Sequence, residues 1–129
     1  MGCFDENSEI MEHFFHPRNV GKIDNPDAIG HVGNPKCGDI MDLYLKIKDN
    51  IIIDAKFQTY GCAAAIASTS VLTELIKGKS IYEALKISNK KIREVLGEMP
   101  PHKYHCTVLA EQALKAAIED YKNLASPEP

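Results

Sequence analysis

Alternating apolar and polar residues mark the clearest element of this chain, between positions 41 and 58. The residues between the apolar ones are mostly polar, and Asp49-Asn50 separates two runs. A period of two on both sides of an Asp-Asn pair predicts an antiparallel hairpin with one buried face. That face would comprise Met41, Leu43, Leu45 and Ile47 from the first run, and Ile51, Ile53, Ala55 and Phe57 from the second.

Helical spacing of apolar residues replaces the alternation after position 62. A helix is expected over 63–77, ending at Gly78, and its buried face would be formed by Ala64, Ala67, Ser68, Val71, Leu72 and Leu75. Short helices are expected over 80–85 and 88–96, the first starting at Ser80 and the second capped by Ser88. The last helix would run from about 105 to 123, with an apolar stripe of Leu109, Ala110, Ala113, Leu114, Ala117 and Tyr121.

The region before the hairpin is less regular. A helix capped by Ser8 should end at about position 15, since Pro17 disfavours helix in the residue before it. Residues 18–38 are rich in Gly, Pro, Asn and Asp, which predicts a long loop with a short edge strand near 29–32. The whole pattern predicts one α+β domain over residues 1–129, with flexible tails at 1–7 and 125–129. Its helices would pack on one face of a small, roughly three-stranded antiparallel sheet.

Composition narrows the class of protein. The chain has 129 residues, 44% of them hydrophobic, which suits one globular core. Its net charge of -3 argues against nucleic-acid binding. The sequence has no apolar run long enough to span a membrane and no secretory signal pattern. We therefore expect a cytoplasmic protein, in which the four cysteines serve as ligands or reactive thiols rather than disulfides.

Three cysteines lie where a loop meets a regular element. Cys62 precedes a predicted helix and Cys106 falls in the first turn of another, where the helix dipole favours the thiolate that binds metal or attacks a persulfide. Cys37 follows Pro35-Lys36 and precedes Gly38-Asp39. On spacing alone, buried structural cysteines explain this set as well as ligands do.

The ligand count favours a labile site. Three thiolates fill only part of the ligand set of a [2Fe-2S] cluster, so Asp39 or His105 would have to supply the fourth ligand. Such a cluster should be less tightly held than one with four thiolates. The same groups would also form an ordinary tetrahedral zinc site. His105 and Cys106 form a poor nucleophile pair, because adjacent residues on a helix do not face each other.

Several motifs then resemble one family, the IscU iron–sulfur cluster scaffolds, which also form the N-terminal module of NifU proteins. The resemblance extends from about position 10 to 124. It rests on His-Pro-Arg-Asn-Val-Gly at 16–21, Pro-Lys-Cys-Gly-Asp at 35–39, Phe-Gln-Thr-Tyr-Gly-Cys at 57–62, Ala-Ile-Ala-Ser at 65–68, Thr-Glu at 73–74, Lys-Gly-Lys-Ser at 77–80 and Pro-Pro-His-Lys-Tyr-His-Cys at 100–106.

The resemblance implies a scaffold rather than an enzyme. Its cluster-binding residues would be Cys37, Cys62 and Cys106, with Asp39 or His105 as fourth ligand. Cys106 would also accept sulfur from a cysteine desulfurase, and Lys103 would contact the thiolates in some states. Ferrous iron would enter, a donor such as a ferredoxin would supply electrons, and apo-acceptor proteins would receive the [2Fe-2S] cluster. A homodimer could convert it to [4Fe-4S], and the purified chain could carry zinc.

Two departures limit what the resemblance implies. His102 stands where the usual Leu-Pro-Pro-Val-Lys handle has an apolar residue, which puts an Hsp70-type chaperone partner in doubt. The N-terminal tyrosine of many members is also missing, and Phe4 is the nearest aromatic residue. The rival function is a zinc-dependent persulfide carrier like the SufU proteins. That branch has a longer stretch between the second and third cysteines and lacks Pro-Pro-x-Lys, so this chain fits the IscU branch better.

The remaining candidate ligands have simpler interpretations. His13 and His16 should lie at the surface or cap the first helix, and His31 is expected to remain away from the site. Cys3 has no motif around it and is expected to be an ordinary thiol.

Overall fold

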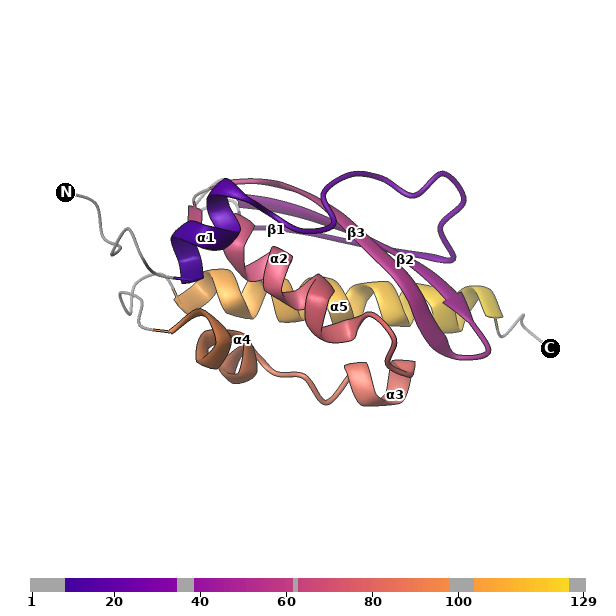
Figure 1. Ribbon diagram of the computed structural model, residues 1–129. Coiled ribbons are helices and arrows are strands. Elements are labelled where there is room, and N and C mark those ends of the chain that lie inside the picture. Colours follow the sequence, from indigo (N-terminus) through magenta and orange to yellow (C-terminus); the bar gives the residue numbers. More distant parts are fainter. Residues whose placement is uncertain (1–8, 35–38, 62, 98–103, 126–129) are drawn as a thin grey trace.

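The computed structural model describes residues 9–34, 39–61, 63–97 and 104–125. Their order is α1 (Glu9–Phe15), β1 (Ala28–Asn34), β2 (Asp39–Lys48), β3 (Ile51–Tyr60), α2 (Ala63–Ile76), α3 (Ile81–Ala84), α4 (Asn89–Leu96) and α5 (Tyr104–Ala125). The strands form an antiparallel sheet in the order β1-β2-β3. Figure 1 shows α2 and α5 beneath this sheet, and α1 and α4 pack on those two helices. The expected α+β architecture is confirmed.

The hairpin forms as predicted, but its second strand has a different buried face. Asp49 and Asn50 both adopt positive φ, 54° and 64°, as a tight hairpin turn requires. A register shift opposite Lys46 and Ile47 inserts an extra residue into β3. Ile52 is consequently fully buried while Ile53 is 51% exposed, so the expected inward positions of Ile51 and Ile53 are wrong. The bulge reverses the alternation before Ala55 restores it.

Helix α2 is buried on nearly every side rather than along one stripe. The sheet, α1, α4 and α5 all pack against it. Its buried residues therefore include the polar side chains Ser68, Thr69, Ser70 and Thr73. These hydroxyls are satisfied within the helix or by α1, for example Ser68 Oγ donates to Ala64 O at 2.6 Å. Leu75, predicted to be core, is only partly buried.

A glycine lets α5 approach the sheet closely. A Cβ atom at Gly30 of β1 would lie 2.1 Å from Ala113 O and 2.7 Å from Ala117 N, both backbone atoms of α5. Only glycine allows this approach. Ile29 N in turn donates to Asp120 Oδ2 at 3.0 Å. The predicted stripe of α5 is buried apart from the partly buried Tyr121, and Ile118 joins it.

The short helices begin where the serines predict, but only one serine acts as a cap. Ser80 forms a reciprocal capping box with Glu83. Ser88 makes no side-chain cap. The first backbone N–H of α4, at Asn89, donates instead to Glu111 Oε1 of α5 at 2.7 Å. A carboxylate on a neighbouring helix thus replaces the local cap, which a pattern of local residues could not indicate.

Backbone hydrogen bonds join the hairpin turn to the segment between α2 and α3. Ile52 N donates to Lys79 O, Gly78 N donates to Ile52 O and Ile81 N donates to Asn50 O, at 2.8, 2.7 and 2.8 Å. We call this region the hairpin end; it comprises residues 49–53 and 77–81. In the described part of the chain, none of the helices could cross a membrane.

Candidate functional site

The structure describes only part of the predicted site. Cys37, Cys62 and Lys103 lie outside the described residues, as do Cys3, His102 and the chaperone handle at 99–103. For Asp39 the strand position is described and the side chain is not. Within the described ranges, His, Cys, Asp and Glu side chains form no group of three or more that could hold a metal ion. The ligand set therefore remains a prediction.

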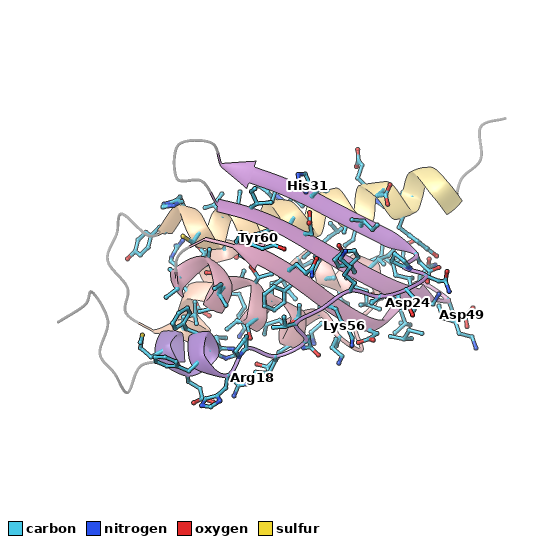
Figure 2. The ribbon with its side chains drawn as sticks, turned by 90° about the horizontal axis from the view of Figure 1, so that it is seen from above. Arg18, Asp24, His31, Asp49, Lys56 and Tyr60 are labelled. Atoms are coloured by element: carbon cyan, nitrogen blue, oxygen red, sulfur yellow. The ribbon has the colours of Figure 1, made fainter. Side chains whose placement is uncertain are left out.

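The described residues that flank these cysteines lie at one end of the molecule. Antiparallel pairing brings the end of β1, the start of β2 and the end of β3 together, with Asn34 opposite Asp39 and Ile40 opposite Tyr60. Helix α2 starts at Ala63, directly after this strand end. In Figures 1 and 2 the N-terminal end of α5 lies beside these strand ends.

Contacts between β1 and α5 fix the direction of that helix. Ile29 bonds Asp120, whereas Gly30, one residue further along β1, packs against Ala113 and Ala117. Strand β1 and helix α5 therefore run in opposite directions, so the end of β1 at Asn34 lies towards the first turn of α5. We call this region the cysteine end; it comprises the described residues 34, 39–40, 59–61, 63 and 104–107. It brings the segments around all three predicted cysteine ligands to one place.

Cys106 and His105 lie in the first turn of α5, as predicted, but their relation differs from the expectation. The Cys106 side chain is fully buried, and His105 is partly exposed. His105 Nε2 lies 3.6 Å from Cys106 Sγ, within the range of a hydrogen bond to sulfur. Adjacent helix residues were expected not to face each other, and this contact contradicts that expectation. The two predicted ligands are thus in contact.

Asp39 is the first residue of β2 and pairs with Asn34, the last residue of β1. Strand alternation places position 39 on the same face as position 41, and Met41 is fully buried beneath the helices. The strand position of Asp39 therefore lies at the cysteine end.

Hydroxyl groups connect the strands to α2 just before position 62. Thr59 Oγ1 donates to Thr69 Oγ1 at 3.2 Å, and Thr69 Oγ1 lies 2.8 Å from Ala65 O and 3.3 Å from Met41 Sδ. The end of β3 is thereby attached to the first turns of α2. These contacts orient both elements that flank Cys62.

A buried histidine attaches α1 to α2, which corrects the prediction that His13 lies at the surface. His13 is 3% exposed, its Nδ1 lies 2.7 Å from Ser70 Oγ, and its Nε2 lies 3.6 Å from Glu74 Oε1. Arg18 N donates to the same Ser70 Oγ at 2.9 Å. The sequence signal for this network was available, because His13 lies three residues from Ile10 on an amphipathic helix.

The other histidines agree with the simpler interpretation. His16 is exposed. His31 is exposed on β1 and pairs with Asp42 on β2. Positions 31 and 42 face each other in the register, on the face of the sheet opposite the helices, as Figure 2 shows for His31. This placement separates His31 from the buried side of the cysteine end.

Charged side chains connect α4 to α5. Burial alone would raise the pKa of Glu111, but hydrogen bonds from Lys115 and Asn89 prevail and hold the pKa of that carboxyl below its usual value. Lys115 Nζ lies 2.9 Å from Glu111 Oε2. Glu111 is therefore ionised at neutral pH and fixes the start of α4 against the middle of α5.

Comparisons with known proteins agree with this fold. The family model for the NifU-like N-terminal domain matches residues 5–126. The chain is 56% identical to the iron–sulfur cluster assembly scaffold protein IscU 1 of Archaeoglobus fulgidus, over 89% of this chain and 75% of that protein. It is 54% identical to the scaffold protein IscU of Haemophilus influenzae, over 90% of this chain and 94% of that protein.

A solved structure shares the fold at lower identity. It is described as a putative iron–sulfur cluster assembly scaffold protein for the SUF system from Fervidobacterium islandicum. The match has a TM-score of 0.75 and 29% sequence identity, and it covers 90% of this chain and 96% of that chain.

Proposed function

This chain belongs to the NifU-like N-terminal domain family, and from that premise we propose that it builds a labile [2Fe-2S] cluster and hands it to other proteins. The chain is a scaffold for iron–sulfur cluster assembly, and the observation that carries this conclusion is its high identity to IscU scaffolds over most of its length. As a scaffold it binds an iron–sulfur cluster and interacts with sulfur donors and acceptor proteins. The cluster type, the ligands and the individual partners are our proposals.

The cargo would be held by Cys37, Cys62 and Cys106, with Asp39 or His105 as the fourth ligand. The contact between His105 and Cys106 supports this set, because two of its members already lie together. A harder oxygen or nitrogen ligand in place of a fourth thiolate leaves one iron less firmly bound. Weak retention suits a protein that must release its product.

Sulfur would arrive as the persulfide of a cysteine desulfurase. The Cys106 thiolate would attack the outer sulfur, the S–S bond of the donor would break, and the donor thiolate would leave. The sulfur then carried by Cys106 needs an electron pair to become sulfide, and a donor such as a ferredoxin would supply it. Ferrous iron enters as a substrate.

We also propose a cytoplasmic setting for this chemistry, because cysteines that act as free thiols persist in a reducing compartment.

A zinc-dependent persulfide carrier is the second candidate. It is favoured by the likeness to the SUF-system protein and by a ligand set that also suits tetrahedral zinc. In this alternative one zinc ion stays bound, and the chain relays sulfur without taking up iron. A zinc ion bound after purification would not separate the candidates, because the same thiolates bind both metals.

The discriminating experiment is anaerobic reconstitution of the full chain. The mixture holds a cysteine desulfurase, cysteine, ferrous iron and a reductant, and visible absorption, iron and acid-labile sulfide are measured. The cluster scaffold predicts [2Fe-2S] absorption with equal amounts of iron and sulfide. A colourless protein that keeps zinc and carries a persulfide on one cysteine would instead establish the sulfur carrier.

A further inference from the structure

Basic residues gather on α4 and directly before it. Four of the chain's 15 lysines and arginines lie between positions 86 and 96, but only one of its 18 acidic residues does. The basic residues are Lys86, Lys90, Lys91 and Arg93, and the acidic one is Glu94. We call the four basic residues the α4 patch. The patch is positive on a chain whose net charge is -3.

The lysines of the α4 patch carry charges that the described fold does not neutralise. Lys86, Lys90 and Lys91 are all exposed. In the described part of the chain none of these three lysines forms an ion pair, whereas Lys46 and Lys115 each lie within ion-pair distance of a carboxylate. Unpaired charges of one sign attract a partner of the opposite sign. The α4 patch therefore suits a partner with an acidic surface.

Contacts at both ends of α4 place the patch beside the first turns of α5. Asn89, the first residue of α4, donates its backbone N–H to Glu111 Oε1 at 2.7 Å. The guanidinium carbon of Arg93, one turn further along, lies 4.6 Å from the centre of the Tyr104 ring. Helix α4 therefore runs alongside α5 from Glu111 back to Tyr104, and Figure 1 shows it beneath the start of α5. Cys106 belongs to this stretch of α5, which is about 10 Å long.

The proposed function requires electrons at this place. When a Cys106 persulfide takes up two electrons, its S–S bond breaks and leaves the Cys106 thiolate and sulfide. A [2Fe-2S] ferredoxin carries one electron, so two reduced molecules must dock in turn, and each is oxidised once. A donor that docks repeatedly benefits from fast association, which complementary charges provide.

We propose that the α4 patch is the docking surface for an acidic ferredoxin that reduces the sulfur on Cys106. This assignment rests on the proposed function, because the electrons are needed only when Cys106 carries sulfur. Lys90 and Lys91 supply most of the attraction, Lys86 adds to it, and Glu94 opposes it. The lysines contact neither sulfur nor iron, so they govern the association of the donor.

The first test measures binding of an oxidised acidic [2Fe-2S] ferredoxin to the full chain by titration calorimetry, without iron or desulfurase. At an ionic strength of about 0.1 M, charges more than about 10 Å apart are largely screened. The double change Lys90→Glu and Lys91→Glu should weaken binding about tenfold or more, because two attractive charges become repulsive. Circular dichroism checks that the fold is kept.

A matched double variant separates the patch from the net charge. Lys48→Glu with Lys79→Glu alters the net charge equally, but these exposed lysines lie towards the hairpin end, which Figure 1 shows opposite α4. This control should change the affinity by less than about twofold. Equal weakening by the two double variants would overturn the proposal, as would a parent chain that binds no ferredoxin.

Glu94→Gln tests the same surface in the opposite direction. It removes the one acidic side chain between positions 86 and 96 and should strengthen ferredoxin binding about two- to threefold, the size expected for one exposed charge. Loss of the fold cannot produce a gain in affinity. Unchanged or weaker binding in this variant would contradict the role of the patch.

The second test concerns the donor role itself. The chain is loaded with a persulfide on Cys106 and mixed with a limiting concentration of reduced ferredoxin, whose oxidation is followed by visible absorption. The rate should fall with the affinity in the Lys90→Glu and Lys91→Glu variant. Weaker binding with an unchanged rate would overturn the donor role and assign the patch to another acidic partner. If Cys106 of the parent takes up no persulfide, the proposed function fails and the donor role with it, while the binding results still test the patch.

Discussion

The hairpin end and the cysteine end are held by different kinds of contact. At the hairpin end, backbone groups of Asn50 and Ile52 bond the backbone of residues 78–81, so the connection survives most changes of side chain. At the cysteine end the strand ends also pair through their backbones, but the described contacts that join α2 and α5 to their neighbours there run through side chains, such as Thr59 with Thr69 and Arg93 with Tyr104. Contacts of the second kind can be broken one at a time.

The largest effect is expected from Cys106→Ser, at the cysteine end. This change should abolish stable sulfur loading by a cysteine desulfurase, because a serine hydroxyl cannot form a persulfide. Mass spectrometry under non-reducing conditions measures the loading, and circular dichroism checks that the fold is kept. Loading that persists on Cys37 or Cys62 would transfer the acceptor role to that residue.

At the hairpin end, Ile52→Ala should cost about 2–5 kcal/mol of unfolding free energy, since it leaves a cavity in the core. The matched change Ile53→Ala should cost about 0.5 kcal/mol or less, because that side chain lies largely in solvent. Urea unfolding of both variants measures the pair. Equal losses of unfolding free energy in the two variants would contradict the burial of Ile52 and the exposure of Ile53, and with them the bulge.

Ser70→Ala tests whether side-chain contacts at α1 break independently of the hairpin end. It removes the hydroxyl that bonds His13 and accepts from Arg18 N, at a cost of about 1–3 kcal/mol. Hydrogen exchange should accelerate in α1 and stay at the parent rate for Ile52 and Gly78. Uniform acceleration across the chain would show that α1 and the hairpin end unfold together.

Asp39→Ala should slow the loss of an assembled cluster, because it removes a labile oxygen ligand or a path for water. The effect should be smaller than that of Cys106→Ser, since the thiolates remain. The decay of visible absorption in air measures the lifetime, with Asp42→Ala, on the other face of the sheet, as control. Faster loss in Asp39→Ala would identify Asp39 as a stabilising ligand.

The smallest effect concerns pH and the bond between α4 and α5. Because the folded pKa of Glu111 lies below its unfolded value, its contribution to stability is complete above the unfolded pKa and is lost as the pH falls through the folded pKa. The parent should therefore be more stable than Glu111→Gln at neutral pH, and the difference should shrink in acid. Urea unfolding at several pH values measures it. A difference that grows in acid would contradict the assigned direction.

Most helices and strands, including the antiparallel hairpin, could be predicted from the sequence because their signals are local. Ser80, Gly78 and the Asp49-Asn50 turn act within a few residues of themselves. The errors arose where a distant residue decides the outcome. Glu111 replaces the expected cap of Ser88, and the bulge at Ile53 lets both Ile52 and Ala55 reach the core.

The candidate site residues were predicted for a different reason. Their cysteines carry recognisable motifs, and pairing of Asn34 with Asp39 brings the described residues on either side of one motif to the strand ends. The burial of Cys106 and its contact with His105 depend on how α5 packs, which no motif encodes. The polar contacts of His13 and Ser70 likewise arise only when α1 meets α2.

The measurement that tests the scaffold function most directly is transfer of a reconstituted cluster to an apo-ferredoxin. The loaded chain is separated from free iron and sulfide, mixed anaerobically with the acceptor, and both proteins are followed by visible absorption after rapid separation. The account predicts that the cluster absorption leaves this chain and appears on the acceptor in equal amount. A cluster that stays on the chain, or that decays without loading the acceptor, would contradict it.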